Sequence, residues 1–163
     1  PSNHDSIADI DSNVKSTIRL LNLMKQYHIP KIVFLSSGGT VYGLINERDG
    51  VSEDHSTYPI SAHGVNKLTI EKYIYLYQRL HHIDYLILRL SNPYGEYHSS
   101  DQQGLINVTL KKILRKEPIT VWGNGGIIRD YIYIKDCVKI IHQKFDGINT
   151  TYNGKSVFGK FLP

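Results

Sequence analysis

Apolar residues recur at helical spacing in two long stretches of the chain. Between about residues 7 and 27, and again over roughly residues 61–81, apolar side chains return every three or four positions. This period is typical of amphipathic helices that bury one face. We therefore expect two long helices, the first of which is ended by His28 and Pro30.

Two runs of consecutive apolar residues alternate with these helices. Residues 31–36 read KIVFLS, and residues 85–91 read YLILRLS. Such runs are typical of parallel strands that are covered on both faces. Because consecutive parallel strands need a crossover connection, the helix–strand–helix–strand order predicts an α/β fold with a parallel sheet.

The rest of the chain is less regular. Polar stretches rich in turn-forming residues predict loops over residues 44–60 and 91–104. Further along, the pattern predicts a helix over 105–116, short strands over 117–123 and 127–134, and a last helix over 135–145.

The composition limits the classes of partner. The chain has 163 residues, with 40% hydrophobic residues, 21% charged residues and a formal net charge of +4, which suits a soluble globular domain. No basic cluster is longer than Lys111–Lys112 and no apolar run approaches a membrane span, so we expect neither nucleic-acid nor membrane binding. The single cysteine, Cys137, fits the reducing cytoplasm, and no metal-ligand spacing is present.

A glycine-rich segment directly follows the first predicted strand. Residues 36–43 read SSGGTVYG. In doubly wound folds, ligands bind beyond the carboxyl ends of strands, and glycines there let the backbone approach a cofactor closely. By itself the segment is a weak signal, because most serine- and glycine-rich strand ends are only turns.

Seven motifs in order along the chain carry a more specific signal. They are SNVKSTIRLL, KIVFLSSGGTVYG, PISAHGVNKLTIEKY, LRLSNPYG, GLI, ITVWGNG and RDYIYIKD. Over about residues 9–153 this order resembles the extended short-chain dehydrogenase/reductases, specifically the NAD-dependent epimerase/dehydratase family that includes UDP-glucose 4-epimerases. The resemblance implies a partial Rossmann-like parallel sheet with part of a smaller α/β region that binds a UDP-sugar.

The resemblance also implies where the reaction takes place. Family members transfer a hydride reversibly between a sugar carbon and NAD, and a Tyr-x-x-x-Lys pair with a strand-end Ser or Thr handles the proton. The lysine corresponds to Lys67, but His63 stands at the tyrosine position and Gly38 at the hydroxyl position. Ser37 or Thr40 could substitute for that hydroxyl. Because an imidazole is shorter than a phenol, we expect epimerisation to be very weak or absent.

The same resemblance assigns further residues to the two ligands. On the cofactor side they are Asn13, Ser36, Ser37, Tyr42, Lys67 and Pro93. On the substrate side they are Asn92, Leu105, Ile106, Trp122 and Arg129. A bidentate guanidinium suits a diphosphate, so Arg129 is expected to clamp that group. For Trp122, a place in the core is the alternative.

One family feature has no counterpart in these residues. It is a strand followed by a Gly-x-x-Gly-x-x-Gly turn, which holds the NAD pyrophosphate at a helix N-terminus. We therefore expect residues 1–91 to be the C-terminal half of the cofactor domain and residues 92–163 to supply substrate-domain segments, packed as one compact unit. NAD binding by this piece should be poor. The resemblance further implies a homodimer through the helices near 7–27 and 61–81.

Two functions remain open from the sequence. The first is a nucleotide-sugar epimerase that acts on UDP-glucose or UDP-N-acetylglucosamine by hydride transfer with NAD. The second is a catalytically inactive or truncated member that only binds a UDP-sugar or dimerises. Gly39 and Thr40 occupy the positions where dehydratases of the family carry an Asp-Glu pair, which favours an epimerase over a dehydratase.

Overall fold

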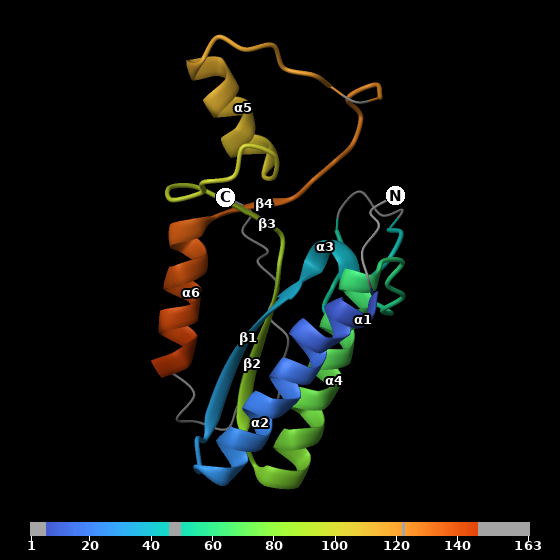
Figure 1. Cartoon of the computed structure of the whole chain (residues 1–163), viewed down its shortest axis with the longest axis vertical. Helices are drawn as coiled ribbons and strands as arrows, with labels where there is room; N and C mark the ends of the chain where they lie inside the picture. The colour runs from blue at the N-terminus through green and yellow to red at the C-terminus, as the bar shows by residue number, and fades with distance from the viewer. Residues whose placement is uncertain (1–5, 46–49, 122, 147–163) are drawn as a thin grey trace. The chain divides into compact units, whose positions relative to one another are not determined.

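The computed structural model describes residues 6–45, 50–121 and 123–146. These residues group into two compact units. The first contains the chain up to Leu90 and again from Lys144 onward, and the second spans Ser91–Gln143. Each unit contains its own pair of parallel strands (Figure 1).

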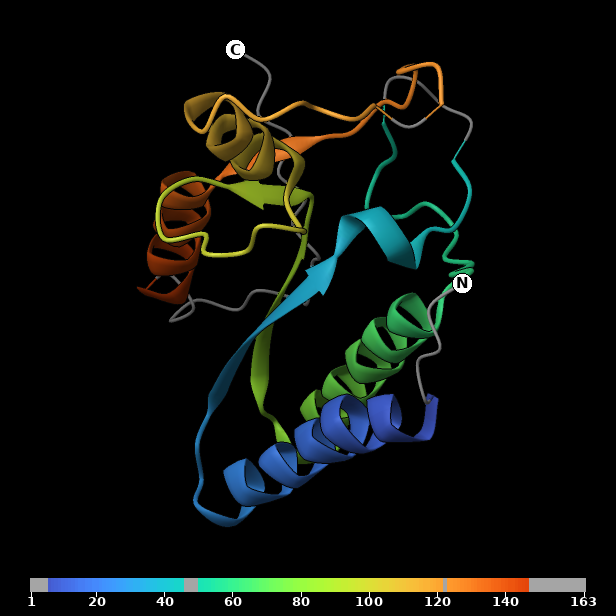
Figure 2. The same ribbon diagram turned by 45° about the horizontal axis from the view of Figure 1, so that its top comes forward.

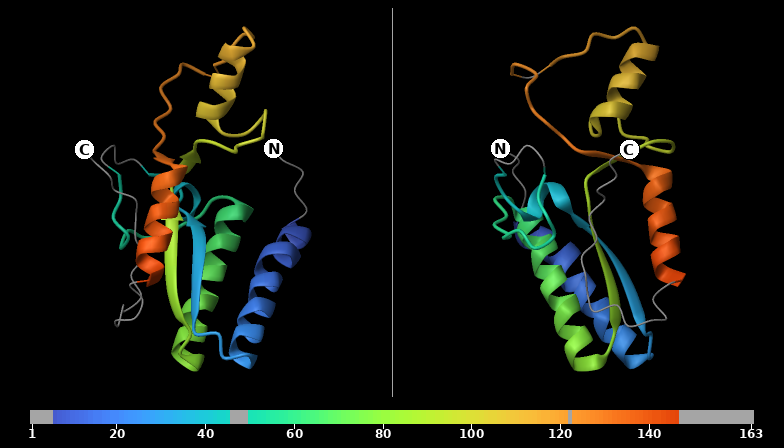
Figure 3. Two further views of the ribbon diagram at one scale, coloured as in Figure 1. Left: turned by 90° about the vertical axis from the view of Figure 1, so that its left-hand side faces the viewer. Right: turned by 180° about the vertical axis from the view of Figure 1, so that it is seen from behind.

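The first unit combines a helical layer with two strands. Its elements are α1 (Ser6–Asp9), η1 (Ile10–Lys15), α2 (Ser16–Gln26), β1 (Lys31–Ser37), α3 (Gly38–Val41), α4 (Ala62–His81) and β2 (Asp84–Leu90). β1 and β2 are parallel, with α2 and α4 on the same face of the pair (Figure 3). The two long helices and two strands predicted for this part are confirmed within one or two residues of the expected bounds.

The first helical stretch contains a wider turn. η1 is π-helical, and the Ser16 hydroxyl donates to the carbonyl oxygen of Asp11, five residues earlier, at 3.2 Å. Asn13 lies in this turn, and its Nδ2 donates to the Asp9 carbonyl at 3.0 Å. Val14 is the buried residue of η1 and joins the core.

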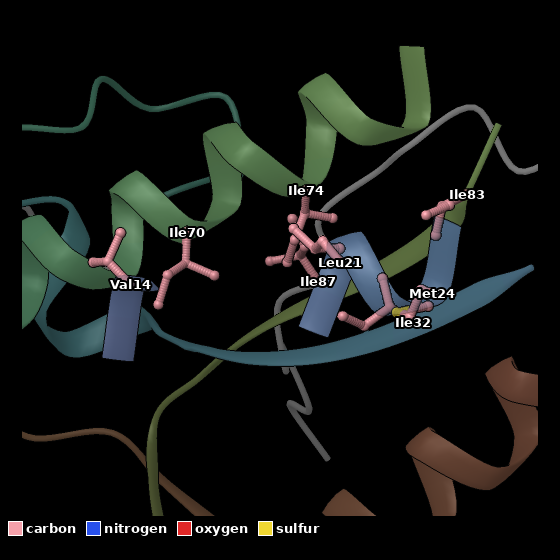
Figure 4. Packing of buried hydrophobic residues seen from close by; sticks show 8 residues of the cluster. All are labelled: Val14, Leu21, Met24, Ile32, Ile70, Ile74, Ile83 and Ile87. Atoms are coloured by element: carbon pink, nitrogen blue, oxygen red, sulfur yellow. The ribbon is translucent and has the colours of Figure 1, made fainter. Parts of the chain in front are cut away.

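The core of the first unit lies between the helices and one face of the strand pair. Its buried cluster consists of Val14, Leu21, Met24, Ile32, Ile70, Ile74, Ile83 and Ile87 (Figure 4). Five apolar positions of the two helical periods are therefore buried, and burial of apolar surface is the main stabilising term in folding, whereas Leu23 and Leu76 of the same periods remain exposed. α4 begins where Ser61 accepts a hydrogen bond from the Gly64 amide, and it ends at His82 in the left-handed region.

The second unit is smaller. It contains β3 (Asn92–Tyr94), α5 (Leu105–Leu114), β4 (Tyr131–Tyr133) and most of α6 (Ile134–Asp146). β3 and β4 are parallel, with Asn92 opposite Tyr131 and Tyr94 opposite Tyr133.

Three sequence-based expectations for this unit are wrong. No strand forms over residues 117–121, because Pro118 has no amide to donate and the segment has no ladder partner among the described residues. The strand expected over 127–134 is limited to Tyr131–Tyr133, and α6 starts at Ile134. The loop expected over 91–104 begins with β3, where Pro93 is tolerated because both strands of a two-stranded sheet are edges.

Candidate functional site

The carboxyl end of β1 leads directly into α3, where the sequence indicated a turn (Figure 2). The first turn of α4 packs against α3. A Cβ atom on Gly64 would lie 2.6 Å from the Thr40 carbonyl oxygen and 2.9 Å from the Cβ of Pro59, so only glycine fits. The Thr40 Oγ1 is buried and has no hydrogen-bond partner among the described residues. A hydroxyl in that state is available to a bound group.

His63 and Lys67 lie one turn apart on one face of α4. The Lys67 Nζ donates to the Leu35 carbonyl at 2.7 Å and lies 4.9 Å from the centroid of the Phe34 ring. Burial lowers the pKa of Lys67. His63 is exposed, and its imidazole makes no hydrogen bond to any residue that the structure describes. The lysine is thus held at the strand end, whereas nothing described orients the imidazole.

A buried polar network lies one turn further along α4. The Glu71 carboxylate accepts from the Ser36 hydroxyl at 2.5 Å and from Arg89 Nη2 and Nε at 2.7 and 3.0 Å. The Nη1 of Arg89 donates to the Tyr42 hydroxyl at 2.7 Å and to the Glu53 carbonyl at 3.2 Å. All four side chains of Ser36, Glu71, Arg89 and Tyr42 belong to buried residues.

Burial and hydrogen bonds within the network shift the pKa values of Arg89 and Tyr42. Burial opposes the charged form of Arg89, but the hydrogen bonds to Glu71 and Tyr42 outweigh this effect and raise the pKa of Arg89. Burial also raises the pKa of Tyr42, and the hydrogen bond from Arg89 offsets this increase only in part.

Ser36 and Tyr42, both expected at the cofactor, have their hydroxyls bonded inside the core. Sequence reasoning missed Glu71 and Arg89, although a charge inside the run YLILRLS was a signal.

Two other residues were expected on the cofactor side of the first unit. Ser37 is the last residue of β1. Asn13 is exposed, and its Nδ2 bonds to the Asp9 carbonyl and the Ser12 hydroxyl. No hydrogen bond among the described residues joins Asn13 or Ser37 to Lys67.

The second unit contains a cavity of about 360 Å³. Its lining includes Asn92, Pro93, Leu105, Ile106 and Arg129, five residues that the family resemblance had assigned to ligands. The other described lining residues are Tyr94, Gly104, Ile119, Thr120, Val121, Gly125, Ile127 and Tyr131. Trp122 lies outside the described residues.

Arg129 is the one charged residue among the described residues that line this cavity. It is exposed and makes no hydrogen bond or ion pair with any described residue. The other residues that line the cavity are uncharged, so the guanidinium of Arg129 is suited to bind an anion there with two parallel hydrogen bonds.

Two sets of hydrogen bonds hold the walls of the cavity. Asn92 donates to the Asp130 carbonyl through its Nδ2 at 2.9 Å and through its backbone amide at 3.2 Å. Asn107 of α5 and Gly95 exchange two bonds: the Gly95 amide donates to Asn107 Oδ1 at 3.2 Å, and Asn107 Nδ2 donates to the Gly95 carbonyl at 2.7 Å. The start of α5 is therefore anchored to the end of β3.

Glu96 ties the end of β3 to the beginning of α6. Its carboxylate accepts from the Tyr133 hydroxyl at 2.7 Å and pairs with the Lys135 ammonium at 2.8 Å. The hydrogen bond from Lys135, and next that from Tyr133, lower the pKa of Glu96 to about 2.

Comparison with known proteins adds the family. The model of the NAD dependent epimerase/dehydratase family matches residues 1–155. The chain belongs to this family. The predicted α/β, Rossmann-type fold class is confirmed by its structural neighbours, which are epimerases of the same family.

Individual family members match over most of this chain. It is 42% identical over 134 residues to "Putative UDP-glucose 4-epimerase" of Methanocaldococcus jannaschii, which covers 82% of this chain and 44% of that protein. It is 36% identical over 169 residues to the dTDP-4-dehydro-6-deoxyglucose reductase of Escherichia coli, covering 98% of this chain and 53% of that protein. The chain thus spans about half the length of these relatives.

Solved structures of epimerases are similar to this chain over most of its length. One is the UDP-N-acetylglucosamine 4-epimerase of Methanobrevibacter ruminantium M1, in complex with UDP-N-acetylmuramic acid, with a TM-score of 0.84 at 25% identity. The match covers 94% of this chain and 48% of the epimerase chain. The UDP-glucuronic acid 4-epimerase of Bacillus cereus, in complex with NAD, has a TM-score of 0.79 at 29% identity. This match covers 97% of this chain and 50% of the epimerase chain. Within the described residues, no helix combines the length and apolar character that a bilayer crossing requires.

Proposed function

We propose that this chain provides the substrate side of an NAD-dependent nucleotide-sugar epimerase that acts on UDP-glucose or UDP-N-acetylglucosamine in the cytoplasm. One observation carries the proposal. Asn92, Leu105, Ile106 and Arg129, assigned to the substrate by the family motifs, come from separate segments and line one cavity.

The chemistry of this cavity suits a uridine diphosphate. Apolar side chains such as Leu105, Ile106 and Ile127 can cover a flat base, while Arg129 can neutralise a diphosphate. The volume of about 360 Å³ lies in the usual range for small-molecule sites, roughly 300–1,000 Å³. Asn92 also lines the cavity, and because its Nδ2 donates to the Asp130 carbonyl, its Oδ1 is the atom that can accept a hydrogen bond from a ligand.

NAD supplies the hydride acceptor when it is bound to members of this family. In this chain, the groups that would hold its nicotinamide end are Thr40, with its buried and unpaired Oγ1 among the described residues, and Lys67 at the strand end. The hydroxyls of Ser36 and Tyr42 are bonded within the core instead. The residues present therefore fit the nicotinamide end.

His63 is the side chain that would accept the proton of the substrate hydroxyl. A neutral imidazole is a competent base near neutral pH. Because His63 is exposed and no described residue orients it, we propose that proton transfer is slow. A misplacement of about 1 Å costs on the order of a hundredfold in rate.

Binding of UDP to the full chain tests the substrate site without requiring turnover. By isothermal titration calorimetry, Arg129→Met should weaken UDP binding by roughly ten- to hundredfold, because a charge-assisted pair of hydrogen bonds is lost. Arg115→Met is the matched control, since Arg115 is a half-exposed arginine that pairs with Asp101 outside the cavity lining. Equal affinities of the two variants, or no UDP binding by the wild type, would contradict the proposal.

We also propose that the chain forms a homodimer through α1–α2 and α4. Apolar side chains remain exposed on these helices, namely Leu20, Leu23 and Tyr27 beside α2, and Leu76 and Leu80 on α4. Light scattering should find a dimer for the wild type and a monomer for Leu23→Asp combined with Leu80→Asp. A monomeric wild type at micromolar concentration would refute the dimer.

A further inference from the structure

We propose that Arg89 is a positioning residue which, together with Glu71, holds the segment after β1 in register with α4. The expected consequence is a fixed spacing between Thr40 on one side and His63 and Lys67 on the other. The catalytic purpose of this positioning rests on the proposed function, in which Thr40, His63 and Lys67 handle the proton. The hydrogen bonds of Arg89 and Glu71 are a feature of the first unit and do not depend on that function.

The register of the strands explains why a charge is buried at this point. Ser36 lies opposite Arg89, and the preceding pair on the same face is Phe34 opposite Ile87. Ile87 belongs to the apolar cluster, and Phe34 packs against it. The helix-facing side of the strand pair is therefore apolar until its last pair, which is polar and next to the carboxyl ends.

α4 repeats a functional side chain once per turn along one face. His63, Lys67 and Glu71 are spaced by four residues. Lys67 contacts the Leu35 carbonyl, and Glu71 contacts the hydroxyl of the next residue, Ser36. Two contacts to consecutive strand residues restrict both the sliding and the rotation of α4 on β1. His63 is thereby placed one turn closer to α3.

Arg89 links this contact to the segment that follows the strand. Its Nε and Nη2 bind Glu71, while its Nη1 binds the Tyr42 hydroxyl at 2.7 Å and the Glu53 carbonyl at 3.2 Å. Tyr42 comes two residues after Thr40, and it is 2% exposed. Only the rigid fork of a guanidinium can serve both sides at once, because a lysine ammonium is a single point charge.

Stability alone does not account for the pair. Removing two charges from water is costly, and replacing a buried ion pair by apolar residues of similar volume is often neutral or stabilising. A buried pair that joins β1, β2, α4 and the segment after α3 instead specifies one arrangement of these elements.

Hydrogen exchange of the full chain, followed by mass spectrometry, separates positioning from general stabilisation. Tyr42→Phe removes only the hydroxyl that Arg89 binds, and Arg89→Lys keeps the charge but loses the fork. In both variants, amides of residues 38–43 should exchange about tenfold faster, as expected when one buried hydrogen bond is lost from a local opening reaction. Peptides from β1, β2 and α4 should keep their wild-type rates. Tyr58→Phe, at an exposed tyrosine, is the control and should change neither.

A charge-free variant completes the test. Glu71→Leu and Arg89→Met, combined with Ser36→Ala and Tyr42→Phe so that neither buried hydroxyl loses its partner, should retain the unfolding midpoint of the wild type while residues 38–43 exchange faster. Wild-type exchange of residues 38–43 in Tyr42→Phe would overturn the proposal, and so would uniform acceleration across the first unit, because the network would then only stabilise. No ligand is used, so a failure here leaves UDP binding untouched, and a failure of UDP binding leaves this measurement valid.

Discussion

The ammonium of Lys67 donates a hydrogen bond to the carbonyl oxygen of Leu35 at 2.7 Å. The lysine of the family motif is therefore positioned by the backbone of β1 and not by its partner on α4. The contact is present with His63, and not a tyrosine, one turn earlier on α4. We propose that Lys67 in this position would pair with a phenol at position 63.

Restoring the tyrosine should restore the reaction. In a full-length context with saturating NAD and UDP-glucose, His63→Tyr is expected to raise the epimerisation rate on the order of a hundredfold, because the longer phenol reaches the substrate hydroxyl and Lys67 lowers its pKa. Product formation can be followed by chromatography of the two UDP-hexoses. Adding Lys67→Met to the variant should abolish the gain, and a wild type as fast as His63→Tyr would refute the interpretation of His63.

Lys67 should make stability depend on pH in a defined direction. Burial lowers the pKa of Lys67 in the folded chain below 10.5, the value for the unfolded chain. At pH values between the folded and the unfolded pKa, the unfolded chain therefore binds more protons than the folded chain. The contribution of Lys67 to the free energy of unfolding therefore increases as pH rises through this window. In urea titrations, the difference between wild type and Lys67→Met should shift in favour of the wild type from neutral pH toward 10.5. A difference that stays constant with pH would contradict this prediction.

Gly64 and Gly39 provide a matched pair for the contact between α3 and α4. Gly64→Ala would bring a methyl group to 2.6 Å from the Thr40 carbonyl, whereas a Cβ on Gly39 meets nothing within 4 Å. We expect Gly64→Ala to reduce the free energy of unfolding by about 1–3 kcal/mol, as other overpacking substitutions do. Gly39→Ala should remain within about 0.5 kcal/mol of the wild type. Chemical denaturation decides, and equal stabilities would show that α3 does not pack against α4 in solution.

The carboxyl group of Glu96 should titrate far below an ordinary glutamate. Carbon-detected NMR is expected to find its midpoint at about 2, because Lys135 and Tyr133 donate to the charged form. The contribution of Glu96 to stability is present at pH values above its pKa in the unfolded chain. This contribution is lost as pH falls through its pKa in the folded chain. Lys135→Met should move the midpoint up toward 4.5, and Tyr133→Phe should move it less. An unchanged midpoint in Lys135→Met would show that the ion pair does not form.

Periodicity predicted the first unit well because its long helices bury one apolar face and β2 buries consecutive residues on both of its faces. The apolar positions of α2 and α4 and the runs in β1 and β2 meet in one core, so local pattern and tertiary packing agree. The second unit was harder to predict. Whether residues 117–121 or 92–94 form a strand depends on a ladder partner elsewhere in the chain, and the local sequence contains no information about that partner.

The candidate sites show the same division. Motif spacing identified residues that do line the cavity of the second unit, such as Asn92 and Arg129. It could not reveal that Tyr42 and Ser36 turn their hydroxyls into the core, because that depends on Arg89 and Glu71, which are distant in sequence and adjacent only after folding.

The two hydrogen bonds between Asn107 and Gly95 also bear on covalent modification. Asn107 begins the tripeptide Asn-Val-Thr, which has the form of an N-glycosylation acceptor. The atom that would receive the glycan is Nδ2, and this nitrogen donates to the Gly95 carbonyl at 2.7 Å. Attachment of a sugar there would replace one of the two protons of this nitrogen and place a bulky group beside the bond that anchors α5 to β3, so we expect folding of the second unit to disfavour modification of Asn107.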